Sequence, residues 1–336
     1  MTYTPTASAP VNNSGGIRAA LRRVAPAFLL FFLSPLVAEF LLGNMSIDAL
    51  GLLLPLAPLY GGGALLIREV TRRTGRGWPT LLLLALAYGL VEEGLAIQTL
   101  FNPSYLGFHL LQEAALPVLG MGAWWTLFVL TLHVVWSVSV PIAMVEALTP
   151  TRETRPWLGR FGLAVAAVLY AFGAFMVHTF THRQDPFTAS SAQLIGTAIA
   201  VLLTLVAAFV LKPRSDVSQV SGAPRPIAAG AACFLLGAAF MAAHYFVKGW
   251  PVVAVYVALY AVAGVTLRLW SRKSDWTPRH RLAVASGLLM TYAANSFVQS
   301  PVVGSKGTVA LIGNAVFTLG AIALILSAAR AQRRAA

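Results

Sequence analysis

Ten apolar runs of about 20 residues follow one another along the chain, separated by short segments rich in Arg, Pro and Gly. As a helix, each run is long enough to cross a hydrocarbon core of about 30 Å at about 1.5 Å per residue. The predicted spans are 24–43, 47–67, 79–101, 123–147, 158–179, 190–211, 226–246, 250–270, 281–299 and 308–329. The pattern therefore predicts an all-α fold, a polytopic transmembrane helical bundle.

The N-terminal segment differs from the rest of the chain. Residues 1–17 are rich in Thr, Ser, Pro, Asn and Gly, which is typical of a disordered tail. The first apolar run lacks a clear small-residue cleavage site, so we interpret it as a retained span rather than a signal peptide. We expect residues 18–336 to form a single transmembrane domain.

Composition and charge agree with a membrane protein. The 336 residues are 58% hydrophobic and only 10% charged, which excludes an ordinary soluble globule. The net charge of +13 would suggest nucleic acid on a soluble protein, but here the basic residues lie in loops between apolar runs. With the N-terminus inside, 21 of the 24 Lys and Arg fall on one side. The positive-inside rule then predicts cytoplasmic termini, a lipid bilayer as the partner and no nucleic acid.

The basic residues also suggest a source. Arg outnumbers Lys by 20 to 4, and Ala, Leu and Gly are abundant, which is typical of a GC-rich bacterial genome. We therefore expect a multi-pass protein of the bacterial inner membrane.

Three polar residues lie where lipid disfavours them. Glu92 and Glu93 sit inside the third run, and His133 sits at a matching depth in the fourth. A charge at the bilayer centre costs about 2.5–3.5 kcal/mol on insertion scales, so such residues need a partner or a function. Because neighbours on an α-helix point about 100° apart, we expect that the two carboxylates do not both face one spot. The bland alternative is a pair of glutamates that only ties helices together.

Other polar residues extend this set toward the outer ends of the spans. His178 and His182 are spaced i,i+4, which places both rings on one face and suits a metal pair such as one for zinc. His244 lies near the outer end of the seventh run, and Asn295 near that of the ninth. We therefore predict a polar cavity open to the outside, with His133, His178, His182 and His244 as possible ligands of a divalent metal. Solvated helix ends would explain the outermost of these residues equally well.

Two further patterns concern packing. Three consecutive glycines, Gly61 to Gly63, permit close helix packing or a kink. Glu146 lies close to the inner loop that contains Arg152, and we expect these two to form an interfacial ion pair.

The polar constellation resembles the CAAX-protease and bacteriocin-processing family of intramembrane proteases, which includes abortive-infection-type proteins. Glu92-Glu93 resembles the family's Glu-Glu-x-x-x-Arg motif, with Ile97 at the Arg position. His133 matches the His of the family's Phe-x-x-x-His motif, and His178 to His182 resembles His-x-x-x-Asn with His in place of Asn. The resemblance covers about a third of the chain.

The resemblance implies a hydrolase, most simply a protease that cuts a membrane-associated peptide near the outer leaflet. A Glu92 or Glu93 carboxylate would deprotonate a water that His133 also holds. His178 or Asn295 would stabilise the oxyanion, and a bound metal could activate the water instead. Two other functions stay open: a proton- or cation-coupled transporter that uses the same residues as a relay, and a non-enzymatic membrane scaffold.

Overall fold

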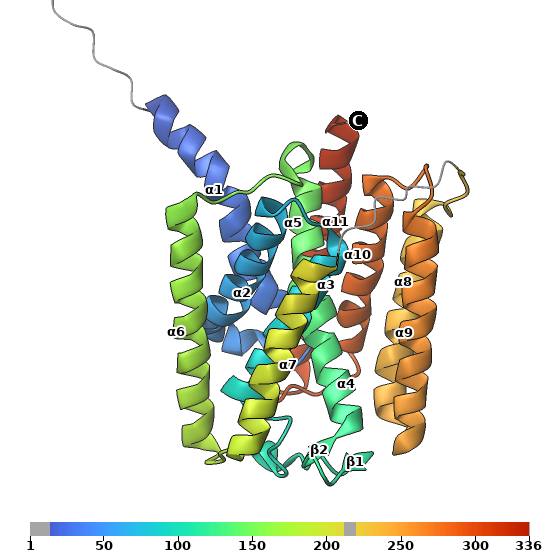
Figure 1. Ribbon diagram of the computed structural model, residues 1–336. Coiled ribbons are helices and arrows are strands. Elements are labelled where there is room, and N and C mark those ends of the chain that lie inside the picture. Colours follow the sequence, from blue (N-terminus) through green and yellow to red (C-terminus); the bar gives the residue numbers. More distant parts are fainter. Residues whose placement is uncertain (1–13, 212–219, 336) are drawn as a thin grey trace, which may run out of the picture.

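The fold is a bundle of long helices, seen in a computed structural model that describes residues 14–211 and 220–335 (Figure 1). The long helices are α1 (Ser14–Pro35), α2 (Leu53–Arg73), α3 (Trp78–Leu90), α4 (Ala123–Thr131), α5 (Val140–Leu148), α6 (Arg160–Gln184), α7 (Ser191–Val210), α8 (Pro226–Phe246), α9 (Trp250–Ser271), α10 (Pro278–Asn295) and α11 (Thr308–Ala335). Within the described residues, nine helical segments are long and apolar enough to cross a membrane. These segments confirm the prediction of a polytopic transmembrane bundle in contact with lipid.

The tenth predicted span is also a helix, α10, which is 18 residues long. It is less apolar than the nine, and it packs between α8 and α11. Residues 1–13 of the predicted tail, and Lys212 and Arg214 of the basic loop after the sixth run, lie outside the described residues. The helix α1 already begins at Ser14, so the last residues of the predicted tail are helical.

Short irregular helices interrupt or join the long ones. Three are π-helical, η1 (Leu36–Leu41), η3 (Val91–Ala96) and η5 (Leu132–Ser139), and three are 3₁₀ turns, η2 (Ile47–Leu52), η4 (Tyr105–Gly107) and η6 (Pro150–Arg152). The long α3–α4 connection contains a small antiparallel hairpin, β1 (Ala115–Leu116) and β2 (Met121–Gly122), in which Ala115 pairs with Gly122.

Helices α4 and α5, joined by η5, form the most buried segment of the bundle. Helices α6, α7 and α9 lie at its edge and expose most of their apolar surface, as expected for helices that face lipid. Helix α6 packs along α2, and α7 packs along α3. The core therefore consists of α1 to α5 together with α10.

The glycine triplet allows α2 to approach three neighbours closely, as predicted. A Cβ on Gly61 would lie 2.0 Å from the Phe31 carbonyl oxygen of α1. A Cβ on Gly63 would lie 2.4 Å from the ring of Tyr88 on α3, and one on Gly62 would lie 3.0 Å from the backbone of Tyr170 on α6. Small residues at helix contacts are a usual means of close packing in membranes.

Buried ion pairs connect α2 to its neighbours at the C-terminal end of α2. The Arg68 guanidinium is fully buried and contacts Glu69 at 2.7 Å and Glu146 at 3.1 Å, while Arg72 contacts Glu146 at 2.7 Å. Arg68 also lies 3.5 Å from the ring centre of Trp157. Glu146 therefore pairs with Arg68 and Arg72 of α2. The reason is that α2 lies beside α5, which brings two guanidinium groups within reach.

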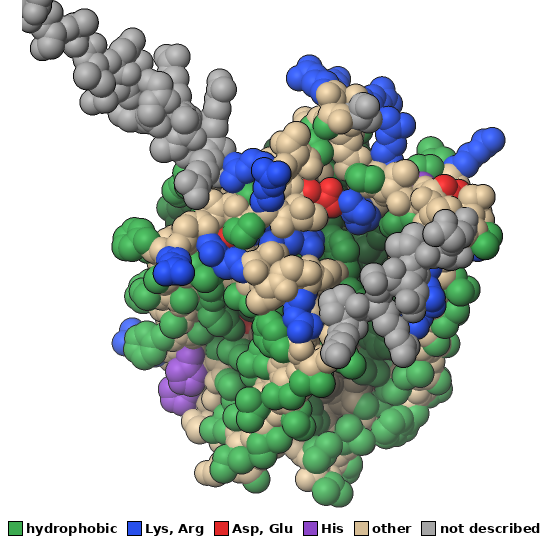
Figure 2. Space-filling view, turned by 45° about the horizontal axis from the view of Figure 1, so that its top comes forward, with side chains coloured by type: hydrophobic (Ala, Val, Ile, Leu, Met, Phe, Trp, Pro, Cys, Tyr) green, Lys and Arg blue, Asp and Glu red, His purple; other side chains and the backbone are tan. Residues whose placement is uncertain are grey.

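The two ends of the described chain lie at the same end of the bundle, where α1 begins and α11 stops (Figure 1). Lys and Arg side chains gather over this end, and green apolar surface covers the flank below it (Figure 2). The hairpin β1–β2 lies at the opposite end (Figure 1). The charge asymmetry seen along the sequence is therefore also an asymmetry in space.

Candidate functional site

The site begins with a change of helix type on two neighbouring elements. Helix α3 continues at Val91 into the π-helix η3, in which the Ile97 amide donates to the Glu92 carbonyl five residues earlier at 2.8 Å. Helix α4 continues at Leu132 into the π-helix η5, which carries His133. Such π-helical turns are rare and often lie at functional sites.

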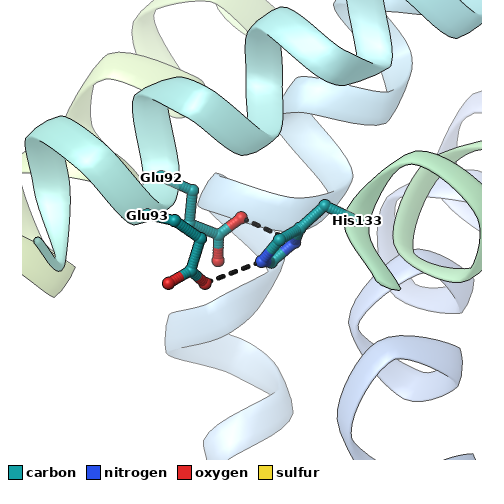
Figure 3. Close-up of side chains that lie close together, drawn as sticks. All are labelled: Glu92, Glu93 and His133. Carbon is teal, nitrogen blue, oxygen red and sulfur yellow. Dashed lines mark hydrogen bonds and ion pairs between the residues drawn. The ribbon is translucent and has the colours of Figure 1, made fainter. Parts of the chain in front are cut away.

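Glu92, Glu93 and His133 converge in the bundle interior (Figure 3). Glu93 Oε1 lies 2.7 Å from His133 Nε2 in a hydrogen bond, and Glu92 Oε2 lies 3.2 Å from Nδ1. All three side chains are buried, with Glu92 fully so. The two carboxylates reach one residue but not one point, because each meets a different nitrogen of the ring. This geometry agrees with the expectation from helix geometry and shows how adjacent glutamates can still share a partner.

Small and aromatic residues shape the surroundings of His133. Gly89 faces the imidazole, and a Cβ there would lie 3.2 Å from His133 Cβ. The ring of Tyr60 is stacked with the imidazole at a centroid distance of 6.2 Å, and that of Tyr88 meets it edge-on at 5.9 Å. Tyr88 in turn lies 5.8 Å from Tyr170 of α6. The imidazole is therefore enclosed by aromatic rings and shielded from lipid.

A second set of contacts fixes Glu93. The Thr99 hydroxyl donates to Glu93 Oε2, and the Trp125 indole N–H donates to Thr99 Oγ1 at 3.0 Å. Glu93 thus has a partner for each oxygen.

Glu92 differs from Glu93 in its hydrogen bonding. Both of its carboxylate oxygens, together with His133 Nδ1 and the Tyr88 hydroxyl, are buried without a hydrogen-bond partner that has good geometry. The Tyr88 hydroxyl faces Glu92. Glu92 Oε2 and His133 Nδ1 still face each other in the 3.2 Å ion pair. Because buried polar atoms are nearly always hydrogen-bonded, Glu92 Oε1 and the Tyr88 hydroxyl mark a place with unused binding capacity.

A polar chain leads from this place toward the end of the bundle opposite the arginines. The Tyr60 hydroxyl donates to Glu39 Oε1 at 2.5 Å, and Asn44 donates to Glu39 Oε2 at 2.6 Å. Asn44 contacts Gln299 at 3.5 Å, and Asn295 donates to Gln299 at 3.0 Å. Since Tyr60 also packs on His133, it links this chain to the site.

The other predicted residues lie elsewhere. His178 Nδ1 lies 2.8 Å from the Ala96 carbonyl, at the end of η3, and the His178 ring stacks with that of His182 at 6.0 Å. His182 Nδ1 lies 3.1 Å from the Phe187 carbonyl. His244 stacks on Phe128 at 4.2 Å. Among the described residues, the structure does not bring these rings together with His133. His178 and His182 of α6 have backbone carbonyls as local partners, and His244 packs against aromatic rings.

Asn295 also stays outside the cluster. It accepts from the Tyr245 hydroxyl at 3.1 Å and donates to Gln299, as part of the Glu39 chain. The expected shared polar cavity is corrected in the same way. The cavity next to the site, about 280 Å³ in volume, is lined by apolar side chains and by Tyr88 and Tyr170.

The donor set can be tested against a metal ion. One donor atom from each of Glu92, Glu93 and His133 lies within 4.8 Å of the others. However, the two carboxylates meet different ring nitrogens, whereas an imidazole offers a metal one lone pair at one nitrogen. One glutamate would have to leave the ring before the three residues could share an ion. The arrangement as it stands fits proton exchange better than metal binding.

Tyr60, Tyr88, Thr99 and Trp125 were not among the residues predicted for the site. Tyr88 could have been found, because it lies four residues before Glu92 and therefore on the same helix face. Thr99 and Trp125 gave no such signal, since their contacts depend on the turn that follows η3.

No curated protein and no solved structure matches the chain. A model of an uncharacterized membrane protein family matches residues 28–334, which is most of the chain, and the chain therefore belongs to this family.

Proposed function

We propose that the protein is an intramembrane hydrolase that activates water at Glu92. The observation that supports this proposal is that Glu92 Oε1 and the Tyr88 hydroxyl are buried without a hydrogen-bond partner, beside the Glu92–His133 ion pair. A buried water typically makes about three hydrogen bonds to such atoms. The resemblance of Glu92, Glu93 and His133 to an intramembrane protease motif points the same way.

The roles follow from the contacts. Glu92 takes a proton from the water while the water oxygen attacks a carbonyl carbon of the substrate. The Tyr88 hydroxyl, which faces Glu92, donates to the oxyanion that forms. His133 lies between both carboxylates, so it can pass the proton to the leaving group while Glu93 holds the imidazole in place. For a peptide substrate the products are a carboxylic acid and an amine.

The test uses the full-length protein in detergent micelles and quenched fluorescent peptides with apolar, membrane-type sequences. We expect E92Q and H133Q to lower the cleavage rate by about 10²- to 10⁴-fold, the usual contribution of a general acid or base. E153Q is the matched control. Glu153 pairs with Arg281 at the basic end of the bundle, in an ion pair that is separate from the site. Cleavage by E92Q at the wild-type rate would contradict the proposal.

A second candidate, proton-coupled transport, is favoured by the chain that joins Glu39 to Tyr60 and His133. Acidic and histidine residues in sequence across a membrane are typical of proton relays. Y60F distinguishes the two functions, because it removes the hydroxyl that reaches Glu39 and leaves Glu92 and His133 in place. In proteoliposomes with an internal pH dye, transport predicts that Y60F slows proton flux, whereas hydrolysis predicts peptide cleavage within a few-fold of wild type. If E92Q, H133Q and Y60F change only thermal stability, the protein is a scaffold.

A further inference from the structure

A groove runs along the lipid-facing side of the bundle, between α6 and α7 and over α2 and α3. Its walls are apolar apart from two tyrosines at its inner part, and its volume is about 280 Å³. The lining residues that matter here are Val70 of α2, Tyr88 of α3, Tyr170 of α6, and Val201, Leu205 and Phe209 of α7. This volume lies near the lower end of the range of small-molecule sites, about 300–1,000 Å³.

The groove has the length of one leaflet. Val201 and Phe209 lie eight residues apart on α7, which corresponds to about 12 Å along the helix. Half of a hydrocarbon core of about 30 Å is about 15 Å. One end of the groove is near the basic end of the bundle, where Val70 precedes Arg73 by three residues, and the other reaches Tyr88 beside the site.

The basic end of the groove carries unbalanced positive charge. The Arg76 guanidinium lies 5.3 Å from the ring centre of Phe209, and Arg73 is exposed and donates to the Leu158 carbonyl at the start of α6. At this end of the bundle, Arg68, Arg72 and Arg73 pair with only two glutamates, Glu69 and Glu146. Arg76 donates to the backbone carbonyls of Ala208 and Leu211 at the end of α7. An apolar slot that leads to an end of the bundle with more arginines than glutamates matches the shape and charge of an anionic lipid.

We propose that this groove binds one anionic phospholipid, with its phosphate at Arg73 and Arg76 and one acyl chain between α6 and α7. The acyl chain ends against Tyr88 and Tyr170, so the lipid packs on Tyr88, which faces Glu92. The lipid is a bound ligand and not the substrate, because its ester bonds lie at the basic end of the bundle and not at Glu92. The inference is independent of the proposed hydrolysis.

The experiment is native mass spectrometry of the full-length protein, delipidated and then mixed with equal amounts of phosphatidylglycerol and phosphatidylcholine. We expect one retained phosphatidylglycerol, preferred over phosphatidylcholine by about fivefold or more, since each basic residue near a membrane surface contributes about that factor. R73Q should reduce this preference without abolishing lipid retention. R330Q, which removes an exposed arginine of α11, is the matched control and should leave it unchanged.

Occupancy of the groove is tested by filling it. L205W places a large ring in the groove, and L203W makes the same change on a side of α7 that does not line the groove. We expect L205W to lose at least about tenfold in retained lipid and L203W to retain it as wild type does. V201F is a second filling variant in case L205W does not fold.

Equal lipid retention by L205W, V201F and L203W would overturn the proposal, as would no preference between the two lipids in wild type. Retention of oleate in place of phosphatidylglycerol, tested in a parallel mixture, would also overturn it and indicate a fatty acid site. None of these outcomes bears on peptide cleavage, so failure here is distinct from failure of the hydrolase proposal.

Discussion

At the scale of single residues, the site depends on two glycines that leave space for larger side chains. Gly89 leaves room for His133, and Gly63 leaves room for the ring of Tyr88. The positions of the tyrosine and the histidine around Glu92 therefore depend on two positions without side chains.

The Gly63 contact makes a prediction about stability. G63A places a Cβ about 2.4 Å from Tyr88 Cε2, so the buried ring must move, and overpacking of this kind typically costs about 1–3 kcal/mol. We expect a lower melting temperature in detergent for G63A, together with reduced peptide cleavage because Tyr88 faces Glu92.

G196A is the matched control for this substitution. Gly196 lies in α7 with no atom within 4 Å of the Cβ position, so alanine should be neutral or stabilising by about 0.5–1 kcal/mol. Similar melting temperatures for G63A and wild type would show that the Tyr88 ring has space to move.

At the scale of elements, the three π-helical segments of the described chain carry Glu39 of the polar chain and the three residues of the site. Glu39 lies in η1, Glu92 and Glu93 lie in η3, and His133 lies in η5. A π-turn adds a residue without ending the helix, so it changes the direction of the side chains that follow. This local change lets polar residues on neighbouring spans turn toward one another inside an apolar bundle.

A loop outside the membrane offers a prediction on pH. The Asp275 carboxylate, between α9 and α10, accepts from the backbone N–H groups of Ala223 and Gly222 at 3.0 to 3.2 Å. These hydrogen bonds lower the pKa of Asp275 below its ordinary value. A group whose pKa is lowered by folding stabilises the protein above its unfolded pKa, and this contribution disappears as pH falls through the folded pKa.

We therefore expect wild type to melt at a higher temperature than D275N near neutral pH, and the difference to shrink between about pH 5 and pH 3. Thermal unfolding in detergent as a function of pH measures both. The Asp275 side chain is exposed, so the difference should be small. A difference that stays constant over this range would mean that the charge of Asp275 does not contribute.

At the scale of the whole molecule, Lys and Arg side chains gather at one end of the bundle, above a flank of apolar surface (Figure 2). The start of α1 and the end of α11 both lie at the basic end, and the α3–α4 connection lies at the opposite end (Figure 1). From the positive-inside rule, we expect the basic end to lie in the cytoplasm. The lipid groove would then open to the inner leaflet, and the Glu39 chain would lead outward.

Cysteine labelling checks this orientation. Cys233 is buried, so it gives little background reaction with a maleimide that does not cross membranes. In intact cells we expect S104C, in the α3–α4 connection, to react, and S274C, in the α9–α10 loop, to react only after lysis. The reverse result would invert the membrane orientation and place the groove in the outer leaflet.

The sequence by itself determined the spans, the gathering of the arginines at one end of the bundle and the shared depth of Glu92, Glu93 and His133. These follow from hydrophobic length and from the cost of buried charge, which act on each segment separately. The sequence also indicated the close packing at Gly61 to Gly63, since glycine is the residue that permits it.

Only the tertiary structure decided which polar residues meet. Helices that are apolar all round give no signal of how they are rotated or which neighbour they face. His178, His244 and Asn295 were therefore candidates for the same site as His133, yet they have contacts at other helix interfaces. The contacts of Glu92 and Glu93 with two different ring nitrogens, and the groove between α6 and α7, likewise depend on the packing of segments far apart in sequence.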